Sequence, residues 1–345
     1  MRASHSERSA PMEAEARTVV GWQGVRCVLP ADWNVSGFSM DRDNGYLRVD
    51  APGTGSLVVQ VRWWNVARSR PRTLYDLAAA VVRRWSRRPE PPVIAPDLRA
   101  NLDNLLKETA RKSRRSHTDF RADIKPERSE GERTAINFTW VGNGRGQGKI
   151  WYCATCHRVL IAQVVGAPQE AGAIGAVASQ LMGSLRCHGE SGYDLWALYD
   201  LQIQIPEDFR LDTQKLLSGY LHLEFARGGE RIFLDRWGLA NLTLKRFTCD
   251  EWLRNHAAVN LSRYTRTLRD DLNGHEIAYY EGVLAPAGKL RAFYEARGSL
   301  RRFPDAYAGG IWNCDVSNRI YAIQAFLRAC DLDVWKGSVQ RCVCH

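Results

Sequence analysis

Two groups of cysteine and histidine residues have the types that a zinc ion requires. The first group consists of Cys153, Cys156, Cys187 and His188. The second group, near the C-terminus, consists of Cys314, Cys342, Cys344 and His345. Three thiolates and an imidazole form a tetrahedral ligand set for zinc. We therefore carry a zinc-binding or redox protein as one functional interpretation. The alternative is that the thiols are buried and pack as small hydrophobic groups.

Two cysteines of the first group also belong to the sequence motif of a haem c attachment site. Cys153, Cys156 and His157 form C-x-x-C-H, in which two thiols would add to the haem vinyl groups and the histidine would bind iron. A related segment later in the chain, Cys314 to Asn318, lacks the second thiol and the histidine. We therefore expect no haem, and zinc as the one possible cofactor.

Two clusters of basic residues could contact phosphate oxygens or an acidic protein surface. The first cluster consists of Arg83, Arg84, Arg87 and Arg88. The second consists of Arg111, Lys112, Arg114 and Arg115. With a formal net charge of +10, the chain favours acidic partners. A nucleic-acid-associated protein is thus a further alternative, with a solvated basic face as the ordinary explanation.

No known catalytic motif stands in the sequence. A nucleophile elbow, a Walker loop, a metalloprotease H-E-x-x-H and a dinucleotide fingerprint are all missing. The glycine-rich stretch from Gly142 to Gly148 joins two predicted strands and does not open a helix, which favours a hairpin turn over a phosphate loop. We expect a protein that is not an enzyme.

The chain repeats itself. Leu29-Pro30-Ala31-Asp32-Trp33 returns as Ile205-Pro206-Glu207-Asp208-Phe209. Four further residues keep their spacing: Trp151, Cys153, Arg158 and Gln163 match Trp312, Cys314, Arg319 and Gln324. A last similarity pairs Cys187 with Cys342. Ordered matches of this kind predict two copies of one domain.

Each copy shows the same predicted order, β-β-β-α-β-β-β-α. The fold class is α+β, with two tandem antiparallel-sheet domains in which helices flank each sheet. A long strand is predicted over Ile150 to Val165, and its equivalent over Ile311 to Leu327. We expect a disordered tail over 1–17, domain one over 18–190 and domain two over 195–345.

Copy one carries an insertion over 87–116 that copy two lacks. A proline-rich loop runs from Pro89 to Pro96, and Asp97 has the type of a helix N-cap. The following leucines, at helical spacing, predict a helix. We expect this insertion to project from domain one and to face a partner.

The two openings, Leu29-Pro30-x-x-Trp33 and Ile205-Pro206-x-x-Phe209, and the element order resemble the PsbP-like fold. That fold is shared by an extrinsic photosystem subunit, a Ran-binding nuclear import factor and type VI secretion effector chaperones. The resemblance implies a non-catalytic binding protein: an adapter, a chaperone or an assembly subunit. It implies another protein as partner without identifying it.

The first residues are polar, and no stretch of the chain is long and apolar enough to form a membrane span. We therefore expect a cytoplasmic protein. In that compartment the nine cysteines indicate thiols or metal ligands before disulfides.

Overall fold

The computed structural model describes residues 16–39, 41, 44–53, 56–66, 96–127, 135–189, 192–199, 201–257, 259–272, 274–284 and 304–344, without the side chains of 269–272. The first basic cluster, residues 89–95 of the proline-rich loop and His345 lie outside these ranges. Among the described residues, no helix combines the length and apolar character needed to cross a bilayer.

Each copy builds one large antiparallel sheet. The first has the order β3-β4-β5-β9-β8-β7-β6 and the second β12-β13-β14-β18-β17-β16-β15, so the topologies are identical. The strands of the first are β3 (Asn34–Phe38), β4 (Asn44–Asp50), β5 (Val58–Asn65), β6 (Arg121–Glu127), β7 (Ala135–Val141), β8 (Arg145–Cys153) and β9 (Arg158–Gly166). Those of the second are β12 (Arg210–Leu217), β13 (Tyr220–Arg227), β14 (Glu230–Gly238), β15 (Thr265–Leu272), β16 (His275–Val283), β17 (Ala306–Cys314) and β18 (Arg319–Leu327).

These sheets confirm the α+β class, and Trp151 and Trp312 lie on equivalent strands, β8 and β17. Each of the two large sheets has seven described strands, where we expected six.

The long strands expected over Ile150 to Val165 and Ile311 to Leu327 are wrong. Each is a hairpin, closed by the pair Cys153↔Arg158 in copy one and Cys314↔Arg319 in copy two. His157 and Asn318 both have φ 53°, in the left-handed region that turns the chain back. Neither turn contains glycine or proline, which are the strongest turn signals, although Asp315, Ser317 and Asn318 are turn-forming residue types.

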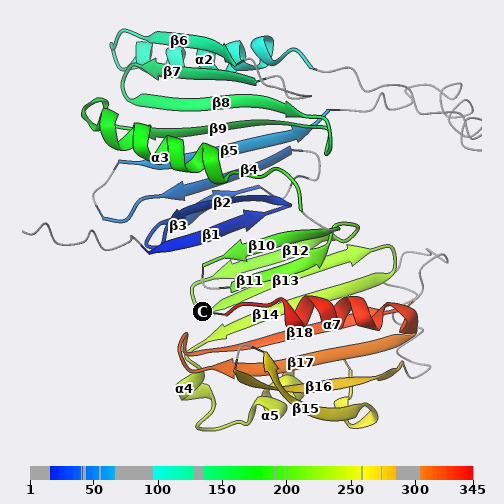
Figure 1. Ribbon diagram of the computed structural model, residues 1–345. Helices are drawn as coiled ribbons and strands as arrows, with labels where there is room; N and C mark the ends of the chain where they lie inside the picture. The colour runs from blue at the N-terminus through cyan, green and yellow to red at the C-terminus, as the bar shows by residue number, and fades with distance from the viewer. Residues whose placement is uncertain are drawn as a thin grey trace, which may run out of the picture.

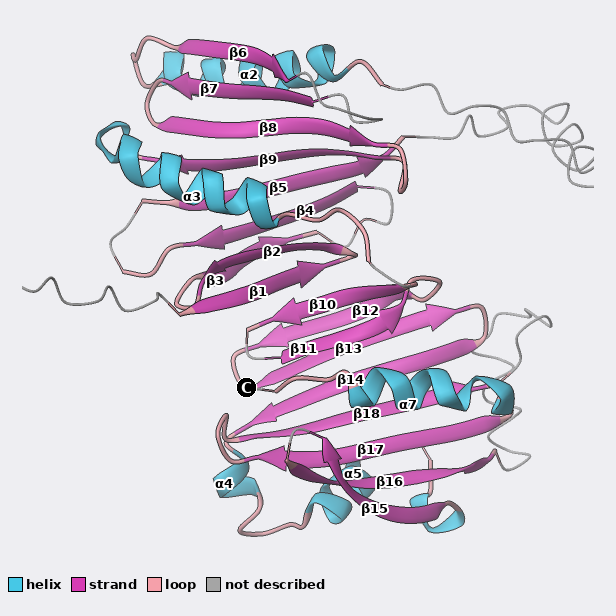
Figure 2. Cartoon of the chain, in the orientation of Figure 1, coloured by secondary structure: helices cyan, strands magenta, loops and turns pink. Residues whose placement is uncertain are grey.

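A smaller sheet joins the two copies. Its order is β11-β10-β1-β2, with β1 (Arg17–Trp22), β2 (Val25–Pro30), β10 (Tyr193–Leu198) and β11 (Leu201–Pro206). Gly21 lies opposite Ala197, and a Cβ at Gly21 would stand 2.8 Å from the carbonyl oxygen of Leu195. Glycine is therefore needed for this close approach. Figure 1 shows the small sheet between the two large ones. Figure 2 shows the same arrangement with all strands in magenta and the helices in cyan.

The core is continuous across this junction. Trp22 of copy one packs edge-on against Trp196 of copy two, with ring centroids 5.0 Å apart. Trp196 in turn contacts Phe225, at 4.9 Å. All three belong to one buried cluster that draws residues from both copies.

Helices cover both faces of each large sheet (Figure 1). In copy one these are α2 (Leu98–Arg115) and α3 (Ala171–Ser184), the latter preceded by η1 (Pro168–Glu170). In copy two they are α4 (Ala240–Thr243), α5 (Cys249–His256), η2 (Leu261–Arg263), η4 (Ala329–Asp331) and α7 (Leu332–Gln340).

The inserted helix does not project from domain one. Asp97 caps α2 by accepting from the Ala100 backbone N–H at 3.0 Å, as its type predicts. Leu98, Leu102 and Leu106 are buried against the sheet, in a cluster with strands β7, β8 and β9. In copy two, α4 and α5 pack on an equivalent face through Ala240 and Leu253. The expectation that this helix projects from domain one is therefore wrong for residues 98–115.

Candidate metal centre

Four donor side chains converge at one end of the first large sheet. They are Cys153, Cys156, Cys187 and His188, and one ligand atom from each lies within 4.8 Å of all the others. The Nδ1 of His188 is 3.3 Å from the sulfur of Cys187 and 3.7 Å from that of Cys153. The structure thus brings together the whole first group singled out in the sequence.

The β8–β9 hairpin positions the first two thiols. Cys153 ends β8 and Cys156 lies in the four-residue turn that leads to β9. On a single strand the two side chains could have pointed to opposite faces, but the turn folds Cys156 back towards Cys153. Because the sequence predicted one continuous strand here, it did not explain how Cys153 and Cys156 come together.

The segment after α3 delivers the other two donors. Arg186 pairs with Arg26 of β2 through two backbone hydrogen bonds of 3.0 and 2.8 Å. Arg158 at the start of β9 donates to the carbonyl of Cys187 at 3.3 Å and to that of Gln23 at 2.8 Å. These bonds hold Cys187 and His188 beside the hairpin turn.

Burial and hydrogen bonding distinguish the thiols electrostatically. Cys153 and Cys187 are buried, whereas Cys156 is half-buried. Hydrogen bonds from Cys187 first, and then from His188 and Cys153, lower the pKa of Cys156 to about 5 against the opposing effect of burial. The same interaction with Cys156 raises the pKa of Cys187. The group thus favours one thiolate even before a cation is considered.

This donor set suits zinc. A tetrahedral ion with Zn–S bonds of about 2.3 Å and a Zn–N bond of about 2.0 Å needs donor atoms roughly 3.5–4 Å apart. The observed upper limit of 4.8 Å requires only small side-chain movements. The histidine beside the thiols is His188; His157 of the C-x-x-C-H spelling instead places its Nδ1 3.0 Å from the Tyr152 hydroxyl.

The second group of the sequence is only partly assembled. Cys314 and Cys344 come together, but the described residue that joins them is His275 of β16. Cys342 is buried and is not in this group. His345 lies outside the described residues. Sequence reasoning missed His275 because only the pairing of β16 with β17 reveals its neighbour.

The second basic cluster lies on the last turns of α2. Its members Arg111, Lys112, Arg114 and Arg115 are exposed. Basic side chains at a helix C-terminus complement the helix dipole. The helix dipole thus accounts for the position of these four residues. Their position does not support the nucleic-acid alternative.

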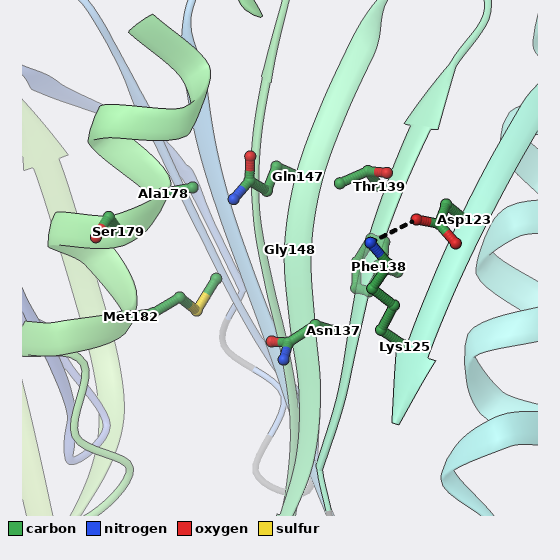
Figure 3. Close-up of a pocket in the computed structure, with 10 residues that line it drawn as sticks. All are labelled: Asp123, Lys125, Asn137, Phe138, Thr139, Gln147, Gly148, Ala178, Ser179 and Met182. Carbon is green, nitrogen blue, oxygen red and sulfur yellow. Dashed lines mark ion pairs between the residues drawn. The ribbon is translucent and has the colours of Figure 1, made fainter. Parts of the chain in front are cut away.

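A groove of about 230 Å³ lies beside α3, a feature that the sequence did not indicate. Figure 3 shows Ala178, Ser179 and Met182 of α3 on one wall and Asp123 with Lys125 of β6 on the other. The Lys125 ammonium is 3.2 Å from the Asp123 carboxylate, and both side chains are largely exposed. Among the described residues that line the groove, none has a buried polar side-chain atom without a hydrogen-bond partner.

Comparisons with known proteins give little further guidance. No protein-family model and no curated protein matches the chain. Among solved structures, the chain is similar to the solution structure of cyanobacterial PsbP (CyanoP) from Synechocystis sp. PCC 6803. The identity is 10% and the TM-score 0.33, over 52% of this chain and 98% of that chain. A similarity at this TM-score carries no argument, and the PsbP-like resemblance stays a prediction.

Proposed function

We propose that this chain is a zinc-binding protein in which Cys153, Cys156, Cys187 and His188 hold a structural ion. One observation carries the proposal: four donors of the types that zinc prefers, supplied by two separate segments, lie within 4.8 Å of one another. Buried thiols that only pack as small hydrophobes have no need of a neighbouring imidazole.

The ligand set favours a structural role for the ion. Three thiolates and one imidazole complete a tetrahedral shell, whereas catalytic zinc sites keep a position open for water or substrate. The ion would fasten the β8–β9 hairpin to the segment that follows α3. That segment continues into β10 and the shared sheet, so the ion would fix the path of the chain between the copies.

Under this proposal the metal stabilises a non-catalytic scaffold. The task of the scaffold is proposed to be the binding of another protein, and its surfaces rather than the ion would carry that task. A redox role would use the same thiols. Retention of zinc by the reduced protein separates the two, because a disulfide would remove two of the four ligands.

Zinc content measured on the full chain, purified without a histidine tag, tests the proposal. We expect Cys156→Ala and His188→Asn to lower the zinc content by one ion per chain. Their controls should keep it: Cys27→Ala for the thiol, because Cys27 is a buried cysteine outside the group, and His157→Asn for the imidazole. Asparagine already occupies the equivalent turn position at Asn318, with the same φ of 53°.

The loss should appear as affinity as well as content. Removal of an outer hydrogen-bonding partner typically weakens metal binding ~10–100-fold, and removal of a direct ligand should exceed that. Competition with a chromophoric chelator measures the change. Equal zinc affinity for His188→Asn and His157→Asn would refute the proposed ligand set.

A further inference from the structure

The second copy contains a three-donor group at the corresponding end of its sheet. His275, Cys314 and Cys344 each place one ligand atom within 4.8 Å of the other two. The register of β16 with β17 pairs Ala278 with Ile311, and its continuation by three residues brings His275 to the level of Cys314. Both thiols are fully buried, and His275 is half-buried.

Backbone pairing shows which residues of the two copies correspond. Cys153 and Cys314 both end the strand before the hairpin turn and pair with Arg158 and Arg319. Arg186 bonds to Arg26 of β2, and Val343 bonds to Gln202 at the same place in β11. The residues that follow, Cys187 and Cys344, are therefore equivalent. The match of Cys187 with Cys342 expected from the sequence is wrong by two residues.

One ligand position differs between the copies. The turn residue Cys156 is replaced by Ser317, whose backbone N–H donates to the Cys314 sulfur at 3.4 Å. The Ser317 hydroxyl is 3.1 Å from that of Tyr321. The serine thus supports Cys314 through its backbone, and His275 brings an imidazole from the adjacent strand to the same sulfur.

Further bonds fix the tail that carries Cys344. Val343 exchanges two backbone hydrogen bonds of 2.8 Å with Gln202. The Tyr321 hydroxyl donates to the carbonyl of Cys344 at 3.3 Å. These hydrogen bonds to the backbone hold the segment that carries Cys344 against the sheet.

We propose that the second copy binds a second zinc-type ion through His275, Cys314 and Cys344. Two thiolates and an imidazole select a borderline-soft cation such as zinc. Its charge would offset two thiolates that are costly to bury alone. The ion would join β16, the β17–β18 hairpin and the C-terminal segment. The proposal uses none of the four ligands of the first site, so each site can fail without the other.

The test uses the full chain with the first site removed by Cys153→Ala and Cys156→Ala. Purified with zinc present and dialysed against buffer, this protein should keep one zinc ion per chain. Adding Cys344→Ala or His275→Asn should abolish that zinc. Adding the matched change Cys342→Ala should leave it, since Cys342 is equally buried and only two residues away.

Cobalt(II) supplies a second readout that does not depend on yield or folding of the ligand variants. In the protein without the first site, cobalt should give thiolate-to-metal charge-transfer absorption. A protein without the first site that holds no zinc and shows no such band would overturn the inference. So would equal zinc content for the Cys342 and Cys344 variants. A variant without His275, Cys314 and Cys344 tests the first site alone. If this variant binds no zinc while the variant without the first site keeps one ion, the result contradicts the proposed function but not the inference of a second site.

Discussion

At the scale of single residues, the sequence predicted the four proposed ligands of the first metal group but not the contacts that hold them together. The types and spacing of Cys153, Cys156 and Cys187 were informative because few other arrangements explain three thiols beside a histidine. What holds them is tertiary: the turn at His157 and the bonds from Arg158 to the Cys187 and Gln23 carbonyls. His275 carried no signal, because a lone histidine at a strand start becomes a candidate only through strand register.

A buried ion network gives a prediction at the same scale. Arg227, only 11% exposed, donates to Glu230 at 2.8 Å, to Asp331 at 2.7 Å and to Asp208 at 3.0 Å. Glu230 is fully buried, so Arg227→Met should lower the free energy of unfolding by about 3 kcal/mol at pH 7. Urea denaturation measures it. The matched change Arg48→Met breaks an exposed pair and should cost under ~1 kcal/mol.

The effect should depend on pH with a definite sign. Burial would raise the pKa of Asp331, but the hydrogen bond from Arg328 and the nearby charges of Arg227 and Arg328 outweigh it and lower that pKa. Its folded pKa is thus below the unfolded value of about 3.9. The contribution to stability is present above that value and is lost as the pH falls through the folded pKa. The difference between Arg227→Met and the parent protein should shrink on acidification, and a constant difference would contradict this account.

At the scale of elements, local signals predicted helices better than strand boundaries. Asp97 and the leucine spacing placed α2 correctly, because capping and periodicity act within a few residues. The hairpins were read as single strands, because the left-handed turn residues are His157 and Asn318 instead of glycine. The packing of α2 was also misjudged, since the proline-rich loop before it indicates nothing about the face on which the helix lies.

The buried face of α2 can be tested directly. Leu102 is fully buried against the sheet, so Leu102→Ala should destabilise the protein by about 3 kcal/mol through lost burial and a cavity. Lys107, exposed on the same helix, provides the matched change Lys107→Ala, which should shift stability by less than ~0.5 kcal/mol. Chemical denaturation of both variants measures these changes. Equal losses of stability would contradict the burial of Leu102 against the sheet.

At the scale of the whole molecule, the duplication predicted two like sheets but not the sheet that joins them. The β1–β2 hairpin turns at Gln23 and Gly24, both with positive φ, a local feature that a sequence can suggest. The pairing of β1 with β10 links segments far apart in the chain. It depends on Gly21 lying against Leu195 and Ala197, which no local pattern announces.

This junction should make the two copies unfold together. Gly21→Val would force a side chain against backbone atoms of β10 and separate the strands. We expect one calorimetric transition for the parent chain and two, or a broadened one, for Gly21→Val. Gly172→Ala is the matched control, because a Cβ there meets nothing within 4 Å. A single unchanged transition in Gly21→Val would show that the shared sheet does not couple the copies.

The coordination shell of the first site is the most direct test of the central claim. Zinc K-edge X-ray absorption should be recorded on the full chain with His275→Asn, Cys314→Ala and Cys344→Ala, which leaves Cys153, Cys156, Cys187 and His188 as the only proposed ligands. We predict a first shell of three sulfurs at about 2.3 Å and one nitrogen at about 2.0 Å. A protein that retains no zinc, or a shell of oxygen and nitrogen without sulfur, would contradict the account.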